Sequence, residues 1–509
     1  MSLGKKKTEE NKNGLNELSF AIHTLGCRVN TYESDAIAQA LKAAGFSERD
    51  FSEAADVYIV NTCTVTNIAD KKSRQMLHRA KKKNPDALVA AVGCYVDAAV
   101  KNPQMQAVLS DASVDLFIQN RDKARVAELV LERMGLSPEK TALPQGATDT
   151  SAAERANKST AETGVQTLSD CAEQDVAGPA LFMTELDGHT RAFVKVQDGC
   201  NQFCSYCIIP YVRGRIKSRP VEDCVEEIRR LSENGVREVV LTGIHLSSYG
   251  KDFLQKEAEK KAGTETKAER LSDDIVNSAD APLLTLLRAV HALPGIERIR
   301  MGSLEPRLMS EEFTAALSEL PKLCPHFHLS LQSGCRETLK RMNRHYTPEE
   351  YRESCERLRR YFKHPAITTD VIVGFPGETD EEFEESRRFL EEIGFYEMHI
   401  FKYSRRAGTR ADKMEAQVPE DVKEARSKVL LHLADEMSDA FRRYYLGKEV
   451  TMLCEEEISL PDGSYAAGYS REYIRCIRKC TDFSQNEILS GTVSEICKEK
   501  AVYESLILR

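Results

Sequence analysis

Three cysteines fall within the stretch Gly199 to Cys207, where Cys200, Cys204 and Cys207 have CxxxCxxC spacing. A [4Fe-4S] cluster has four irons, so three thiolates would bind three of them and leave the fourth open to another ligand. An open iron predicts chemistry at the cluster and not only electron transfer. A structural zinc site is a weaker alternative, because no fourth Cys or His lies nearby at the usual spacing. Buried thiols without a metal are the other alternative.

Three more cysteines each come just after a strand-like run in the N-terminal part of the chain. They are Cys27, Cys63 and Cys94, after the runs at residues 20–22, 57–60 and 89–92. Helical patterns at residues 32–44 and 69–83 separate these runs, which predicts a parallel sheet whose ligands gather at the carboxyl ends of its strands. Each cysteine alone would be read as a buried core residue. Together they offer a second incomplete ligand set for a [4Fe-4S] cluster.

Composition limits the class of protein. A chain of 509 residues with 41% hydrophobic and 30% charged residues is long enough for about three globular domains. Residues 1–14 contain no apolar signal region, and no run reaches the 18 or more apolar residues of a membrane helix, so we expect a cytoplasmic protein without a membrane partner. In such a chain, cysteines outside motifs are expected to pack as small apolar residues. These nine are Cys171, Cys224, Cys324, Cys335, Cys355, Cys454, Cys476, Cys480 and Cys497.

The net charge of −9 argues against a uniformly basic nucleic-acid-binding protein, but local patches remain compatible with it. The predicted helix at residues 71–83 carries seven cations and no carboxylate. Such a helix would attract phosphates, although a charge run is more often a solvated face. Both readings stay open from the sequence.

The middle of the chain repeats a strand–helix unit six times, two units short of a closed eightfold barrel. The predicted strands are 192–197, 238–242, 296–301, 327–331, 367–373 and 397–402. Polar residues that follow these strands would lie at the active-site rim of such a barrel, or would instead cap helices and turns. The candidates for binding a cofactor are Thr242, Ser303, Glu305, Ser330 and Gln332, with His245 and His328 as further possible site residues.

After about Gly447 the pattern changes to short strands separated by turns, which predicts a small β-barrel. Its cations interleave with two tyrosines, a combination suited to phosphate contact and base stacking. These residues are Tyr469, Arg471, Tyr473, Arg475, Arg478 and Lys479. The predicted organisation is an α/β domain at 18–143, a flexible linker at 144–189, a barrel at 190–440 with a surface insert at 251–281, and a β-barrel at 441–509.

The CxxxCxxC motif with an aromatic residue, Tyr206, before its last cysteine resembles the signature of radical S-adenosylmethionine (radical SAM) enzymes. The six units fit the partial (β/α)6 barrel of that superfamily. The whole order of segments resembles the methylthiotransferases, whose C-terminal module is the RNA-associated TRAM domain. The residues around the cysteines, at 24–30, 61–67 and 207–214, look most like the branch that acts on N6-threonylcarbamoyladenosine beside the tRNA anticodon.

This resemblance implies two [4Fe-4S] clusters, one on Cys200, Cys204 and Cys207 and one on the three N-terminal cysteines, together with S-adenosylmethionine. The implied reaction replaces the C2 hydrogen of the adenine by a methylthio group, which needs a radical because that C–H bond is too strong for acid–base chemistry. The implied partners are tRNA, a sulfur donor, and an electron donor such as flavodoxin or ferredoxin. The alternatives are methylthiolation of isopentenyladenosine in tRNA or of a ribosomal-protein aspartate, and a noncatalytic iron–sulfur protein that binds RNA.

Overall fold

The computed structural model describes residues 18–136, 181–184, 190–262, 275–497 and 505–509. The chain forms two compact units, Met1–Met183 and Thr184–Arg509, which are described separately below. Most of the predicted linker, residues 144–180 and 185–189, lies outside the described residues. The sequence-predicted domain boundaries remain predictions.

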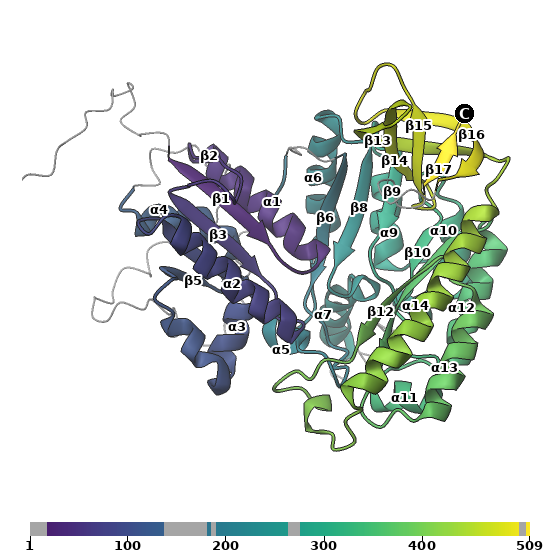
Figure 1. The fold of residues 1–509 in the computed structure, drawn as a ribbon, viewed down its shortest axis with the longest axis horizontal. Helices are drawn as coiled ribbons and strands as arrows, with labels where there is room; N and C mark the ends of the chain where they lie inside the picture. The colour runs from purple at the N-terminus through teal and green to yellow at the C-terminus, as the bar shows by residue number, and fades with distance from the viewer. Residues whose placement is uncertain (1–17, 137–180, 185–189, 263–274, 498–504) are drawn as a thin grey trace, which may run out of the picture. The chain divides into compact units, whose positions relative to one another are not determined.

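The first unit is a parallel five-stranded sheet with helices between its strands (Figure 1). The strand order is β2-β1-β3-β4-β5, so β1, β3 and β4 are neighbours. The strands are β1 (Ser19–Thr24), β2 (Ser47–Glu48), β3 (Val57–Thr62), β4 (Leu88–Gly93) and β5 (Leu116–Ile118). The helices are α1 (Arg28–Ala43), α2 (Asn67–Lys83), α3 (Cys94–Lys101) and α4 (Val126–Arg133), with short 3-10 segments at Pro103–Ser110 and Asn120–Arg125.

Burial on both faces of this sheet explains its continuous apolar strands. Every residue of β3 is buried. Two separate apolar clusters lie on the two sides, one containing Ile37 and Leu41 of α1 and the other Leu77 and Ala80 of α2. The parallel sheet predicted from the strand–helix alternation is confirmed.

The second unit begins with a partial barrel. Its parallel strands are β6 (Arg191–Asp198), β8 (Glu238–Gly243), β9 (Arg298–Met301), β10 (His326–His328), β11 (Ala366–Val373) and β12 (Glu397–Lys402). They form two sheets, β7-β6-β8-β9 and β10-β11-β12, connected by single parallel bridges such as Leu304 to Leu329. The six predicted strands are confirmed. The short edge strand β7 (Lys217–Ser218), which pairs antiparallel with β6, was not predicted from the sequence.

Helices connect the barrel strands, and two of them begin with capping residues. Thr347 and Thr379 each form a capping box with a glutamate three residues later, which satisfies free N–H groups at the first turn of α12 and α13. The longer helices are α6 (Val221–Glu233), α7 (Lys251–Ala262), α9 (Pro282–His291), α10 (Glu311–Ser318), α12 (Pro348–Tyr361), α13 (Asp380–Ile393) and α14 (Glu420–Arg443). The shorter ones are α5 (Ile209–Val212), α11 (Arg336–Arg341) and 3-10 turns at Leu246–Ser248, Pro306–Leu308 and Ala411–Lys413.

The predicted insert at 251–281 is ordered at its two ends. Its first part is the helix α7, and Val276 and Ala281 near its end are buried. Residues 263–274 lie outside the described residues. The surface insert predicted at 251–281 therefore begins with a helix.

The chain ends in a closed barrel of order β13-β14-β15-β17-β16. Its strands are β13 (Glu449–Leu460), β14 (Gly463–Ser470), β15 (Arg475–Lys479), β16 (Ile488–Ile496) and β17 (Leu506–Leu508). The sequence analysis missed β17, which pairs with both β15 and β16 and so closes the barrel. A closed barrel leaves no free strand edge.

Candidate active site

The loop that carries Cys200, Cys204 and Cys207 follows β6 and is fixed by backbone hydrogen bonds. The N–H of Cys200 donates to Gly214 O at 3.1 Å, and the N–H of Ser205 donates to Met342 O at 2.9 Å. Gly199 has a φ of +67°, and a Cβ there would lie 1.9 Å from Arg215 O. Only glycine fits this position, so the loop leaves β6 in one defined direction.

The motif cysteines are free thiols with donors aimed at their sulfur atoms. Arg344 Nη1 lies 3.2 Å from Cys204 Sγ, and the N–H of Gln202 donates to Cys200 Sγ at 3.4 Å. Burial raises the pKa of Cys200 and Cys207 to about 12, so these thiols stay protonated unless a metal replaces their protons. N–H donors around sulfur are the environment that protein-bound iron–sulfur clusters use. The three residues therefore fit an iron–sulfur cluster.

Arg344 also connects this loop with Glu305. Arg344 Nη2 lies 3.0 Å from Glu305 Oε1, and His245 Nε2 lies 3.3 Å from Glu305 Oε2. Burial alone would raise the pKa of Glu305, but the charges of His245 and Arg344 outweigh it and lower the pKa to about 2. Glu305 is thus held as a carboxylate beside the cysteine loop. No motif in the sequence pointed to Arg344, because its role depends on contacts with residues far away in the chain.

The other sequence-predicted cofactor candidates lie at or beyond the carboxyl ends of barrel strands. Thr242 is buried at the end of β8, and Ser303 is exposed just after β9. Ser330 follows β10, and its carbonyl accepts a hydrogen bond from Tyr346 at 2.6 Å. Gln332 has a φ of 73° and donates its N–H to Asp370 O at 2.9 Å. Their positions agree with the predicted rim, and their contacts with S-adenosylmethionine remain predictions.

In the first unit, Cys27, Cys63 and Cys94 follow the neighbouring strands β1, β3 and β4. A Cβ on Gly26 would lie 2.9 Å from Cys63 Sγ, so the chain beside Cys27 approaches Cys63 closely. Asn120 Nδ2 donates to Cys94 Sγ at 3.5 Å. As predicted, the three cysteines follow neighbouring strands at the carboxyl edge of the sheet. Three thiols are ligands that fit an iron–sulfur cluster.

A buried polar network supports the loops of these cysteines. Asn30 Nδ2 donates to Leu25 O at 2.6 Å and to Thr62 O at 3.0 Å, which joins the segments before Cys27 and Cys63. Lys123 and Glu33 form an ion pair whose side chains are 2% and 1% exposed. Sequence analysis did not single out this pair, since its members are 90 residues apart.

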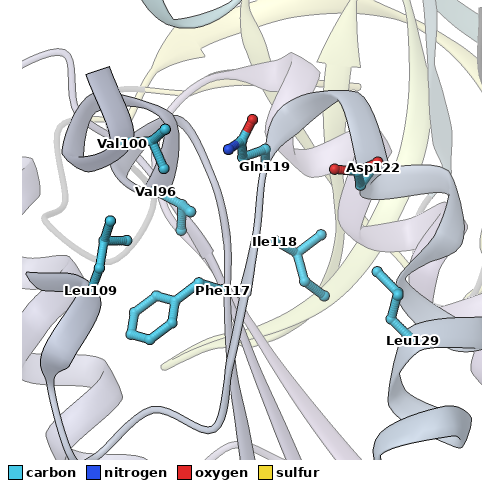
Figure 2. Close-up of a pocket in the computed structure, with 8 residues that line it drawn as sticks. All are labelled: Val96, Val100, Leu109, Phe117, Ile118, Gln119, Asp122 and Leu129. Carbon is cyan, nitrogen blue, oxygen red and sulfur yellow. The ribbon is translucent and has the colours of Figure 1, made fainter. Parts of the chain in front are cut away.

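A small apolar cavity of about 20 Å³ also lies in the first unit, lined by residues such as Val96, Phe117, Ile118 and Leu129 (Figure 2). That volume holds about one water molecule. It cannot hold a nucleoside or S-adenosylmethionine, so it is a packing defect and not a substrate site.

Two family models match the chain, the Radical SAM superfamily over residues 194–390 and "Uncharacterized protein family UPF0004" over residues 19–116. The threonylcarbamoyladenosine tRNA methylthiotransferase MtaB of Bacillus subtilis is 34% identical over 91% of this chain and 91% of its own. MtaB of Aquifex aeolicus is 35% identical over 88% and 95%, respectively. The chain belongs to the methylthiotransferase family of radical SAM enzymes. A tRNA-2-methylthio-N(6)-dimethylallyladenosine synthase of Caldicellulosiruptor saccharolyticus is also 35% identical, over 87% of this chain and 83% of its own.

Helix α2 of this methylthiotransferase follows Cys63 and has an exposed basic face. Lys72, Arg79 and Lys82 on it are exposed. Two other cations of the helix are engaged, Lys81 with Asp115 at 3.0 Å and Arg74 with the hydroxyl of Tyr95 at 2.9 Å. Val65 and Ile68 at the N-terminal end are 50% and 68% exposed. A cationic face that begins with apolar residues beside a cysteine site is suited to a polyanion that must reach that site.

The predicted RNA-binding residues of the methylthiotransferase's C-terminal barrel also contact other residues of the chain. Tyr469 and Tyr473 stack with ring centroids 4.7 Å apart, and Arg191 of β6 lies over both rings. Arg475 pairs with Glu456 at 2.8 Å, and Lys479 with Asp462 at 3.0 Å. In the same way, Arg471 donates to Leu323 O at 2.8 Å and Arg478 to Ser490 O at 2.9 Å. The prediction that these residues contact RNA phosphates and bases stays a prediction.

No helix in the described part of the chain combines the length and apolarity that crossing a bilayer requires.

Proposed function

We propose that this chain converts N6-threonylcarbamoyladenosine beside the tRNA anticodon into its 2-methylthio derivative. The observation that carries this proposal is the similarity to MtaB along 91% of both chains. The two family matches, at 19–116 and 194–390, contain the two cysteine sets. The proposed partners are tRNA, a sulfur donor, and a flavodoxin or ferredoxin as electron donor. Such a substrate would place the enzyme in the cytoplasm.

The ligand sets follow from the two cysteine sites. Cys200, Cys204 and Cys207 would hold one [4Fe-4S] cluster, and the N-terminal set would hold the second. Bound together with S-adenosylmethionine, these groups supply the radical and the sulfur that the reaction needs. The N-terminal set is Cys27, Cys63 and Cys94.

The chain's own side chains hold and orient these groups. Arg344 would compensate negative charge at Cys204, and Glu305 would accept a hydrogen bond from a hydroxyl or amino group of S-adenosylmethionine. Asn120 would donate to Cys94 in the same way that Arg344 does to Cys204. Thr242, Ser303, Ser330 and Gln332 are the further proposed contacts with S-adenosylmethionine.

We assign the C-terminal barrel, residues 441–509, to the TRAM-like modules. Support comes from the five-stranded closed barrel and from its position after the Radical SAM match at 194–390. The radical SAM barrel would span 190–440. The N-terminal domain would span 18–143, with the linker at 144–189.

The test is mass spectrometry of tRNA nucleosides from cells that lack this gene and from the same cells with the gene restored. We expect 2-methylthio-N6-threonylcarbamoyladenosine to be absent from the tRNA of cells that lack the gene and to be present again when the gene is restored. Unchanged levels in a strain without a redundant enzyme would refute the assigned substrate. The second candidate substrate is the dimethylallyladenosine of tRNA, favoured by relatives of that name at 35% identity. Loss of its methylthio derivative in the same experiment would support that alternative.

The basic face of α2 leads to a prediction about tRNA binding. Changing Lys72, Arg79 and Lys82 together to alanine should weaken tRNA binding and lower the slope of log affinity against log salt by about 2 to 3. Each phosphate contact contributes roughly 0.7 to 0.9 to that slope. The measurement is tRNA affinity across a salt series. The control is the charge-conserving triple variant with Lys72→Arg, Arg79→Lys and Lys82→Arg, which should keep the slope. Equal slopes for the alanine variant and the unaltered protein would show that α2 is only a solvated face.

A further inference from the structure

Three potential metal ligands lie on neighbouring strands of the partial barrel, and none of them is a cysteine. They are His328 of β10, Asp370 of β11 and His399 of β12, and one ligand atom of each lies within 4.8 Å of the others. In the strand register, His328 lies opposite Thr368, and Asp370 lies opposite His399. Side chains two residues apart on a strand share a face. All three therefore project from the same side of the sheet.

His328 is oriented as a metal-binding histidine requires. Its Nδ1 lies 3.0 Å from Thr368 Oγ1, and its Nε2 lies 3.3 Å from Asp370 Oδ2. When Nδ1 donates its hydrogen to the hydroxyl, the lone pair of neutral Nε2 faces the carboxylate. Metal-bound histidines are held by such a hydrogen bond from the other ring nitrogen. A cation or a proton between Nε2 and Oδ2 would make this contact favourable.

The spacing and charge favour a metal ion. Two ligands that each lie about 2.0–2.2 Å from one zinc ion are roughly 3.0–3.5 Å apart, which matches the contact of His328 with Asp370. In the described part of the chain, His328 is the one ion-pair partner recorded for Asp370. A divalent cation would offset the negative charge that Asp370 places beside the two histidines.

The site is enclosed by protein on one side and open on the other. The side chains of His328 and Asp370 are 13% and 29% exposed, and His399 is exposed. Catalytic zinc sites and non-haem iron(II) sites have a similar donor set, with a few protein ligands and at least one open position. Water or an anionic oxygen of a ligand would occupy the open position.

We propose that His328, Asp370 and His399 bind one divalent cation of the zinc or iron(II) class, without help from the six motif cysteines. This site goes beyond the proposed methylthio transfer and does not depend on which adenosine is the substrate. Sequence analysis placed His328 among the possible site residues, but Asp370 and His399 had no motif to mark them.

The test uses the anaerobically purified protein with its iron–sulfur clusters loaded, dialysed against buffered Zn²⁺. Zinc and iron per chain are measured by mass spectrometry for the unaltered protein and for Asp370→Asn, His399→Gln and His432→Gln. We expect about one zinc per chain in the unaltered protein and in the His432→Gln control, whose histidine lies exposed on α14 beside Glu436. The other two variants should lose zinc, with affinity lowered at least about 100-fold, because even the loss of an outer hydrogen-bond partner costs 10–100-fold. Their iron content should be unchanged, which reports that the protein is folded and its clusters are intact.

Zinc X-ray absorption on the same samples identifies the ligands. We expect nitrogen and oxygen neighbours at about 2.0–2.2 Å and no sulfur. Sulfur neighbours would mean that zinc occupies the cysteines and would overturn the proposal. Equal zinc in all four proteins, or none in the unaltered protein, would also overturn it and leave His328 and Asp370 as a simple ion pair.

Discussion

Cys204→Ala is expected to abolish methylthio transfer and to lower the iron content from about eight to about four per chain, because each [4Fe-4S] cluster contains four irons. Cys204 is the motif cysteine in contact with Arg344 at 3.2 Å. Loss of product should be at least about 1,000-fold, since the uncatalysed replacement of an aromatic hydrogen is negligible on this scale. The measurements are iron analysis, formation of 5′-deoxyadenosine from S-adenosylmethionine, and methylthiolated tRNA nucleosides.

Two matched variants separate the two cysteine sites from general effects of losing a thiol. Cys63→Ala should also halve the iron content but should still form 5′-deoxyadenosine, because it leaves the motif loop of the second unit intact. Cys224→Ala removes a fully buried cysteine of α6 and should keep all iron and both products. If Cys204→Ala retained 5′-deoxyadenosine formation while Cys63→Ala lost it, the assigned roles of the two sites would be reversed.

Glu238→Gln is expected to lower the stability of the second unit by roughly 3–5 kcal/mol, because it leaves buried arginines without their carboxylate. The side chain of Glu238 is 1% exposed, and its Oε1 lies 2.7 Å from Arg300 Nε. Arg298 and Arg191 lie within 3.6 Å and 3.9 Å of the same carboxylate. Arg300 in turn donates to Ser470 O and Arg471 O, so the change also weakens the attachment of the C-terminal barrel.

The acid dependence of stability provides a second readout for Glu238. Burial would raise the pKa of this carboxyl, but the arginines, Arg300 first, outweigh burial and lower it. A group whose pKa is lower in the folded than in the unfolded protein stabilises the fold above its unfolded pKa, near 4.5 for Glu. This contribution is lost as the pH falls through the folded pKa. The unaltered protein should therefore lose more stability than Glu238→Gln when the pH falls below about 4.5.

Thermal unfolding of the cluster-loaded protein at pH 7 measures the first effect, and unfolding of the cluster-free protein between pH 7 and pH 3 measures the second. The control is Glu297→Gln, which breaks an exposed ion pair with Arg237 and should change the midpoint little. Equal unfolding midpoints for Glu238→Gln and Glu297→Gln at pH 7 would mean that the buried network contributes no more to stability than an exposed ion pair.

Local sequence patterns predicted most of the secondary structure. The runs at 57–60 and 367–373 are the strands β3 and β11. They could be predicted because the period of apolar residues along the chain distinguishes strands from helices. Short elements were harder to predict from the sequence. Strands β7 and β17 contain only two and three residues, too few for a period to be visible. The prediction of a surface insert at 251–281 did not include helix α7, which lies at its start.

The sequence by itself determined the six motif cysteines, the parallel α/β organisation and the family. Close spacing makes Cys200, Cys204 and Cys207 a ligand set in any fold that leaves their loop exposed to iron. Tertiary structure alone decided that Arg344 meets Cys204, 140 residues away, and that Arg191 lies over the ring of Tyr473. It also decided that His328, Asp370 and His399 face one another across three strands. Periodicity records whether a residue is buried, but not which distant residue it meets, because that partner is set by strand order and register.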